Sequence, residues 1–209
     1  MTELESLYRQ HDGILVVELV LHSVIQLFNN LDPAPFQEKE LDAEAEDYIY
    51  SVLEEIPYAR EVEMVVYLPP PLATPENRDA IVLGIRNHFL YKVAGTVKEQ
   101  RRLFRDGRIV LLIGLTVLSL SLLARQILLE FPDTQINHML GEALLIVGWV
   151  AMWEPVSIFL YGWWPIFHRR RIYQKIAAME VFVQPLPDGG IPPLLKVQGP
   201  ATPESLGAL

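Results

Sequence analysis

The chain contains no cysteine among its 209 residues. This absence excludes disulfide frameworks, thiolate metal sites and cysteine nucleophiles together. The sequence also has no Gly-rich phosphate loop, no HExxH and no GxSxG, and its five histidines lie far apart without metal-ligand spacing. Only His88, beside Phe89 on a predicted long helix, stands out among them. We therefore expect no cofactor, no metal site and no catalytic residue.

A secretory signal is missing too, because the N-terminus MTELESLYRQHDG has neither a basic segment nor an apolar core. We expect the first hundred residues to stay in the cytoplasm, where they are made. Charge is unevenly distributed: residues 1–79 hold 17 acidic residues and 4 Lys/Arg, whereas residues 80–209 hold 9 and 13. The pattern predicts an acidic first part and a basic remainder.

Hydrophobic residues are plentiful, at 51% of the chain with a mean hydropathy of +0.22, which favours membrane association. Sixteen residues without a charge run from Ile109 to Ala124, and Arg125 with the following QILL extends this apolar segment to about 20 residues, the usual spanning length. We predict transmembrane helices at 108–129 and 140–165, joined by a short extracytoplasmic loop at 130–139. Lys/Arg flank the pair on its outer sides, so both termini should be cytoplasmic. We expect lipid-facing basic anchors at Arg101, Arg102, Arg105, Arg108, Arg169, Arg170 and Arg171.

The remaining segments predict an α/β (α+β) small cytoplasmic domain into which the two-helix transmembrane hairpin is inserted. Strand patterns occur at 14–23 and 61–68, and amphipathic helices are expected at 42–56 and from Pro75 to about 106. We assign 1–107 to the acidic head with its long helix, and 166–185 to a basic juxtamembrane helix and a returning third strand. The three strands should pair in one sheet, since each needs a backbone partner. Residues 186–209 are Pro/Gly-rich and predicted to be disordered.

An acidic run precedes and opens the helix expected at 42–56. It has three interpretations: a solvated helix start whose acids favour the N-terminal dipole, a divalent-cation site, or a docking surface for a basic partner. The first is favoured, since the run does not match an EF-hand loop. The candidate docking residues are Glu38, Glu40, Asp42, Glu44, Glu46 and Asp47.

Glu154 and Pro155 interrupt the second apolar segment. An ionised side chain at mid-bilayer costs roughly 2.5–3.5 kcal/mol, so an acid there normally faces a partner or water, or is protonated. Pro155 leaves the carbonyl of Ala151 without its helical hydrogen bond, which predicts a kink. Glu154 either bonds Thr116, Ser119 or Ser121 of the first helix, or a freed backbone carbonyl, and fixes the hairpin, or it serves a function in a larger assembly.

Small residues recur every seven positions in both apolar segments. Because seven residues make about two helical turns, each set forms a stripe along which helices approach closely. The predicted packing residues are Gly114, Ser121, Gly141, Gly148 and Gly162, with Gly107 and Pro155 in the same register.

The stretch LDPAPFQEKELDAEAEDYI followed by two spans resembles a group of uncharacterised bacterial membrane proteins with an acidic cytoplasmic head and a two-span transmembrane hairpin. The resemblance covers the head and hairpin and carries no known activity. It implies a bacterial inner (plasma) membrane origin.

These observations predict a non-enzymatic, multi-pass membrane protein that acts as an accessory, scaffold or regulatory subunit. Its expected partners are the lipid bilayer and either further copies or another membrane protein, without nucleic acid. The main alternative is an oligomeric proton or cation transport or channel component that uses Glu154. An enzyme that uses the acidic run with a divalent cation is a third hypothesis.

Overall fold

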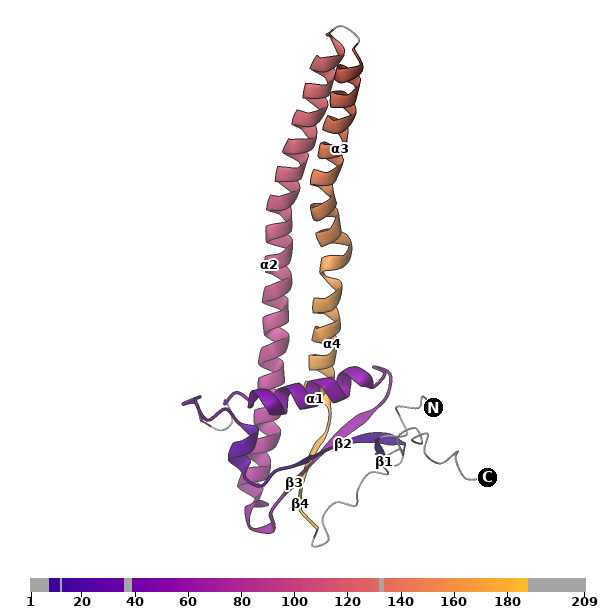
Figure 1. Cartoon of the computed structure of the whole chain (residues 1–209). Coiled ribbons are helices and arrows are strands. Elements are labelled where there is room, and N and C mark those ends of the chain that lie inside the picture. Colours follow the sequence, from indigo (N-terminus) through magenta and orange to yellow (C-terminus); the bar gives the residue numbers. More distant parts are fainter. Residues whose placement is uncertain (1–7, 12, 36–38, 132–133, 188–209) are drawn as a thin grey trace, which may run out of the picture. The chain divides into compact units, whose positions relative to one another are not determined.

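The computed structural model describes residues 8–11, 13–35, 39–131 and 134–187. The chain divides into two compact units, which we call the head unit (Met1–Lys92 with Arg171–Leu209) and the hairpin unit (Val93–Arg170). The strands and helices follow in the order β1 (Arg9–His11), β2 (Ile14–Val20), η2 (Val24–Leu27), α1 (Ala43–Glu55), β3 (Val62–Leu68), η3 (Pro70–Leu72), α2 (Pro75–Leu129), α3 (Gln135–Ser157), η4 (Ile158–Gly162), α4 (Trp164–Ala178) and β4 (Val181–Pro185) (Figure 1).

The head unit is built on a four-stranded sheet with the order β1-β2-β3-β4. β2, β3 and β4 are parallel, with Val17 opposite Met64 and Val66 opposite Val183. The mixed α/β class is therefore confirmed, including the returning strand after the hairpin. β1 was not expected, because three polar residues carry no alternating pattern. It pairs antiparallel to β2 through a turn in which Gly13 has a φ of 85°, a conformation that glycine adopts without strain.

One face of the sheet forms the core of the head unit. Val17, Met64 and Val66 point from this face into a cluster with apolar residues of α1, the first turns of α2 and the end of α4. The fully buried partners from these helices are Ile49, Ile81, Ile85, Phe89 and Ile176. Burial of such side chains contributes about 1.5–3 kcal/mol each. Residues on both sides of the hairpin in sequence thus share one core.

Local sequence explains where the helices of the head unit begin. The Asp42 side chain accepts a hydrogen bond from the Glu44 backbone N–H at 3.0 Å and caps α1, which ends just before Pro57. Ser23 and Gln26 form a capping box on the short η2. α2 starts at Pro75. Proline is favourable there because the N–H that it lacks would make no hydrogen bond within the helix at the first position.

α2 is one uninterrupted helix of 55 residues that belongs to both units. The expected boundary at residue 107 marks the start of apolar sequence, whereas the head unit ends at Lys92, where the helix leaves the apolar core. No proline interrupts α2 after its first residue. The helix therefore continues without a break through the Lys/Arg-rich residues 98–108.

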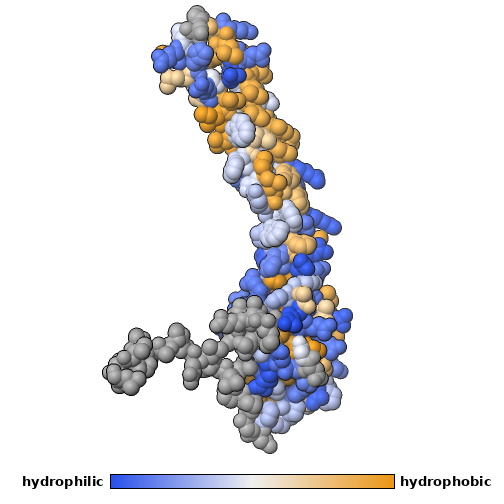
Figure 2. All heavy atoms as spheres, turned by 90° about the vertical axis from the view of Figure 1, so that its right-hand side faces the viewer, coloured by the Kyte–Doolittle hydropathy of each residue, from blue (hydrophilic) through white to orange (hydrophobic). Residues whose placement is uncertain are grey.

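Two helical stretches, Pro75–Leu129 and Gln135–Ala178, are long and apolar enough to cross a membrane. Only 17% and 11% of their most apolar windows are buried, unlike the core helix of a soluble protein. Figure 2 shows hydrophobic side chains gathered over the helical pair, with hydrophilic ones near its loop end. The exposed apolar residues of these two helices include Leu112, Ile113, Leu120, Ile146 and Val150.

The second stretch is irregular near its middle. Pro155 lies inside α3, and the π-helical turn η4 starts three residues later, before α4 resumes. The wide turn is visible between α3 and α4 in Figure 1. Because a proline removes one backbone donor, a local change in hydrogen-bond pattern is expected beside it. The structure has a π-helical turn shortly after Pro155, and the kink expected at Pro155 itself stays a prediction.

Candidate functional site

The glycines of the hairpin unit other than Gly95 lie where its two helices touch. A Cβ placed on Gly114 would be 2.8 Å from the Ala151 carbonyl oxygen and 3.2 Å from the Pro155 ring. A Cβ on Gly148 would be 2.8 Å from Leu118 and 3.4 Å from Ser121, which is itself buried. Gly107 and Gly162 likewise face Ile158 and Leu103, while Gly141 faces the stem of Arg125. These positions together form a continuous contact, which we call the seam.

Pro155 has two effects at the seam. Its ring is buried against Gly114, and it leaves the carbonyl of Ala151 free of the usual i to i+4 bond. That carbonyl points at Gly114, where the absence of a side chain lets it approach the opposing backbone. The close approach of the two helices leaves no room for a path between them within one hairpin.

Glu154 points away from the seam. Its side chain is exposed, and among the described residues it has no hydrogen bond or ion pair. The expected bond to Thr116, Ser119 or Ser121 is therefore not formed. The reason is geometric: successive helical residues are about 100° apart, so when Pro155 occupies the seam its neighbour turns outward. Thr116 instead donates to the Leu112 carbonyl at 2.8 Å.

Trp149, Val150, Trp153 and Glu154 line a shallow hollow of about 330 Å³ on the outer surface of α3. Trp149 and Trp153 are 71% and 73% exposed, one helical turn apart. The i, i+4 spacing of the two tryptophans is the sequence signal that places them on one side of the helix. We call these four residues the Glu154 face.

Some of the basic residues near the candidate spans form ion pairs or ring contacts within the chain. Asp106 lies 3.2 Å from Arg105 and 3.8 Å from Arg102, and Arg169 pairs with Glu99 at 2.7 Å. Arg171, in the head unit, lies over the ring of Tyr58 at 4.1 Å. Arg101 and Arg108 are exposed. The Nε atom of Arg170 is buried and has no hydrogen-bond partner among the described residues.

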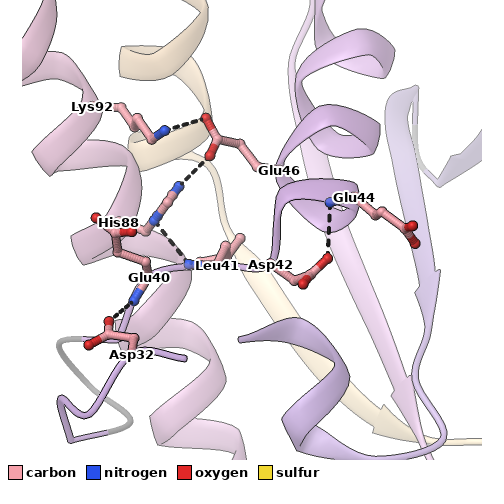
Figure 3. Close-up of polar contacts among 8 residues, drawn as sticks. All are labelled: Asp32, Glu40, Leu41, Asp42, Glu44, Glu46, His88 and Lys92. Atoms are coloured by element: carbon pink, nitrogen blue, oxygen red, sulfur yellow. Dashed lines mark hydrogen bonds and ion pairs between the residues drawn. The ribbon is translucent and has the colours of Figure 1, made fainter. Parts of the chain in front are cut away.

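His88 joins three segments of the head unit and is almost completely buried (Figure 3). The Leu41 backbone N–H donates to its Nδ1 at 3.1 Å, and its Nε2 lies 3.1 Å from a Glu46 carboxylate oxygen. Because an amide N–H can only donate, Nδ1 is the acceptor and the ring hydrogen lies on Nε2, directed at Glu46. The other Glu46 oxygen pairs with Lys92 at 2.8 Å. Both ring nitrogens are thus occupied.

This arrangement favours the neutral form of His88. Burial lowers the pKa of the imidazole, Lys92 lowers it further, and the Glu46 carboxylate opposes both effects. A second proton would have to bind Nδ1 and would break the hydrogen bond from Leu41. With no free ring nitrogen, His88 positions the Leu41 segment against α2 and is not available to a substrate.

The acidic run does not form a single surface. Glu46 is directed toward His88 and Lys92, and Asp42 caps α1, whereas Glu44 points away from both (Figure 3). Glu40 and Asp47 are exposed, and Glu38 lies outside the described residues. Within the described ranges, no group of three His, Asp or Glu side chains gathers closely enough to hold a metal ion. The carboxylates of this run therefore have separate roles.

Comparisons with protein-family models, with curated proteins and with solved structures found no match for this chain.

Proposed function

We propose that this chain is a non-enzymatic integral membrane protein that acts as an accessory, scaffold or regulatory subunit. The two long apolar helices support insertion, since most of their apolar windows is exposed. The basic residues outside the hairpin support an orientation with both ends in the cytoplasm. We propose the bacterial inner membrane as the location. The absence of catalytic motifs from the sequence supports a role that depends on binding.

The observation that carries the proposal is the exposed carboxyl of Glu154. Counting from Leu140 to Pro165, Glu154 is the fifteenth of 26 residues and thus close to mid-membrane. A charged group there costs roughly 2.5–3.5 kcal/mol on insertion scales. The seam does not relieve this cost, because Glu154 points away from it. Contact with another membrane protein surface would relieve it, which is what a subunit of a larger assembly provides.

The test is the mass of the purified full chain in mild detergent, measured by size exclusion with light scattering. We expect a protein mass above that of one chain, 23.8 kDa. Glu154→Leu should reduce the mass to that of the single chain. Glu142→Ala is the matched control, because Glu142 is also an exposed acid of α3 but lies near its loop end. A single-chain mass for the unmodified protein would contradict the proposal.

The transport alternative uses the same carboxyl in a different way. Since the seam is closed within one hairpin, a proton or cation path would have to lie between subunits, along the Glu154 face. In this alternative Glu154→Gln abolishes an ion flux in proteoliposomes while the assembly keeps its mass. An unmodified protein that conducts no flux would exclude transport and leave the accessory role standing.

A further inference from the structure

The Glu154 face carries three polar groups without a partner in the described structure. The indole N–H groups of Trp149 and Trp153 can only donate hydrogen bonds, and the Glu154 carboxylate can only accept them. None of the three bonds another described residue. In hydrocarbon an unpaired donor or acceptor is unfavourable, because no water is present to replace the missing partner.

Interfacial anchoring does not account for the two tryptophans. Tryptophans that anchor a span lie at the ends of the apolar segment, as Trp163 and Trp164 do. Trp149 and Trp153 are instead the tenth and fourteenth of the 26 residues that begin at Leu140. Trp153 therefore lies at the depth of Glu154, and Trp149 lies about 7.5 Å from it along the helix axis. Both are inside the apolar segment, where a protein contact is needed to satisfy their donors.

The donors and the acceptor on this surface complement one another across a twofold axis. Copies of one chain insert in the same orientation, so a symmetric pair has its axis along the membrane normal, and residues of equal depth meet. In such a twofold contact, every contact occurs twice: if residue i of one copy touches residue j of the other, then residue j of the first copy touches residue i of the second. Trp153 and Glu154 differ in depth by only about 1.5 Å.

We propose that the surface that covers the Glu154 face is a second copy of this chain, with the Trp153 indole of each copy donating to Glu154 of the other. The hollow beside Glu154 then receives side chains of the facing copy, and Trp149 forms its wall. This inference rests on the proposed membrane insertion and identifies the partner of the same surface. A second copy thus provides partners for the Trp153 donor and the Glu154 acceptor of both chains.

Disulfide crosslinking tests the contact directly, because the chain has no cysteine of its own. Val150→Cys places a thiol at the centre of the face, where the side chain is 67% exposed. Leu120→Cys is the matched control, since Leu120 is 61% exposed on α2, near the level at which Ser121 meets Gly148. Both variants are reconstituted in liposomes at a low protein-to-lipid ratio and oxidised. We expect a dimer band for Val150→Cys and little for Leu120→Cys.

Second substitutions in the Val150→Cys background test the hydrogen bond. Trp153→Phe keeps an aromatic ring but removes the donor, so the dimer band should fall severalfold. Glu154→Leu should nearly abolish it. Glu154→Gln keeps an acceptor of the same shape without a charge and should retain most of it. This variant also guards against a loss of signal through misfolding, because it preserves the size of the side chain.

Three outcomes would overturn the inference. Equal crosslinking of Val150→Cys and Leu120→Cys would indicate random association, and unchanged crosslinking in Trp153→Phe and Glu154→Leu would exclude the proposed bond. No crosslinking of Val150→Cys would exclude a second copy at this face. In that last case the light-scattering mass separates the two proposals: a complex with a different protein leaves the accessory role intact, whereas a single-chain mass overturns both.

Discussion

His88 shows how a single buried side chain can connect distant segments. It lies 47 residues from Leu41 and 42 from Glu46, yet it bonds both and thereby holds the segment before α1 against α2. Leaving a buried polar group such as the Leu41 N–H without its partner costs about 1–3 kcal/mol. Helical periodicity placed His88 next to an apolar stripe, but no sequence pattern could pair it with Glu46, because that contact depends on the tertiary fold.

The lowered pKa of His88 predicts a pH-dependent stability of the head unit. Above about pH 6.5, the ordinary value for histidine, folded and unfolded states are both neutral at this site and stability is greatest. Below it the unfolded state binds the proton first, so stability decreases as the pH falls toward the folded pKa, by about 1.4 kcal/mol per pH unit. The free energy of unfolding can be measured at each pH by urea unfolding of the full-length Val66→Cys variant. Its buried cysteine reacts with a thiol label only when the head unit unfolds, so the extent of labelling is the readout.

The control for that experiment is His88→Asn, which keeps an acceptor near the position of Nδ1 and does not titrate. We expect it to lower the free energy of unfolding by about 1–3 kcal/mol at pH 7, because the Glu46 contact is lost. It should also flatten the change between pH 6.5 and pH 5. An equal slope in both proteins would show that other groups cause the pH dependence.

At the scale of secondary-structure elements, the seam predicts that glycines of one stripe differ in their tolerance of substitution. Gly114→Ala brings a methyl group against the backbone carbonyl of Ala151, which cannot rotate away, and should cost about 1–3 kcal/mol. Gly148→Ala meets the end of the Leu118 side chain, which can move, and should cost less. In thermal unfolding measurements in detergent, Gly114→Ala should unfold at a lower temperature than Gly148→Ala.

Gly95→Ala is the control for the seam variants. No atom lies within 4 Å of a Cβ at Gly95, so alanine there should stabilise α2 by about 1 kcal/mol or less. Equal tolerance at Gly95 and Gly114 would contradict the close approach of the two helices.

The elements themselves were largely predictable, because their signals are local. Asp42 and Pro57 mark the limits of α1, and a short apolar run was enough to place the returning strand. β1 was missed because Arg9, Gln10 and His11 have no apolar alternation, and its pairing comes from the adjacent turn. The direction of the Glu154 face could not be predicted for another reason. Its direction depends on Pro155 occupying the seam, which only the packing of the two helices determines.

At the scale of the whole molecule, the sheet predicts the membrane topology without reference to charge. β3 precedes the hairpin and β4 follows it, and the two strands pair directly. In the proposed membrane protein both must therefore lie on the same side. Single cysteines at Ser51 and Gln174 should react alike with an impermeant maleimide in sealed vesicles, and a cysteine at Ile136, in the loop region, should react only from the other side. Opposite labelling of Ser51 and Gln174 would contradict the pairing.

The pairing of β3 with β4 also sets an order of events during synthesis. The two strands are separated by 112 residues, so at roughly 10 residues per second the ribosome produces β4 about 10 s after β3. During that interval β3 has an unpaired edge, and Ile172 and Ile176 are still missing from the core. The core of the head unit is therefore completed only after the whole hairpin has been synthesised. In the proposed membrane protein, the second helix must also bring the chain back to the side of β3 before the sheet can close.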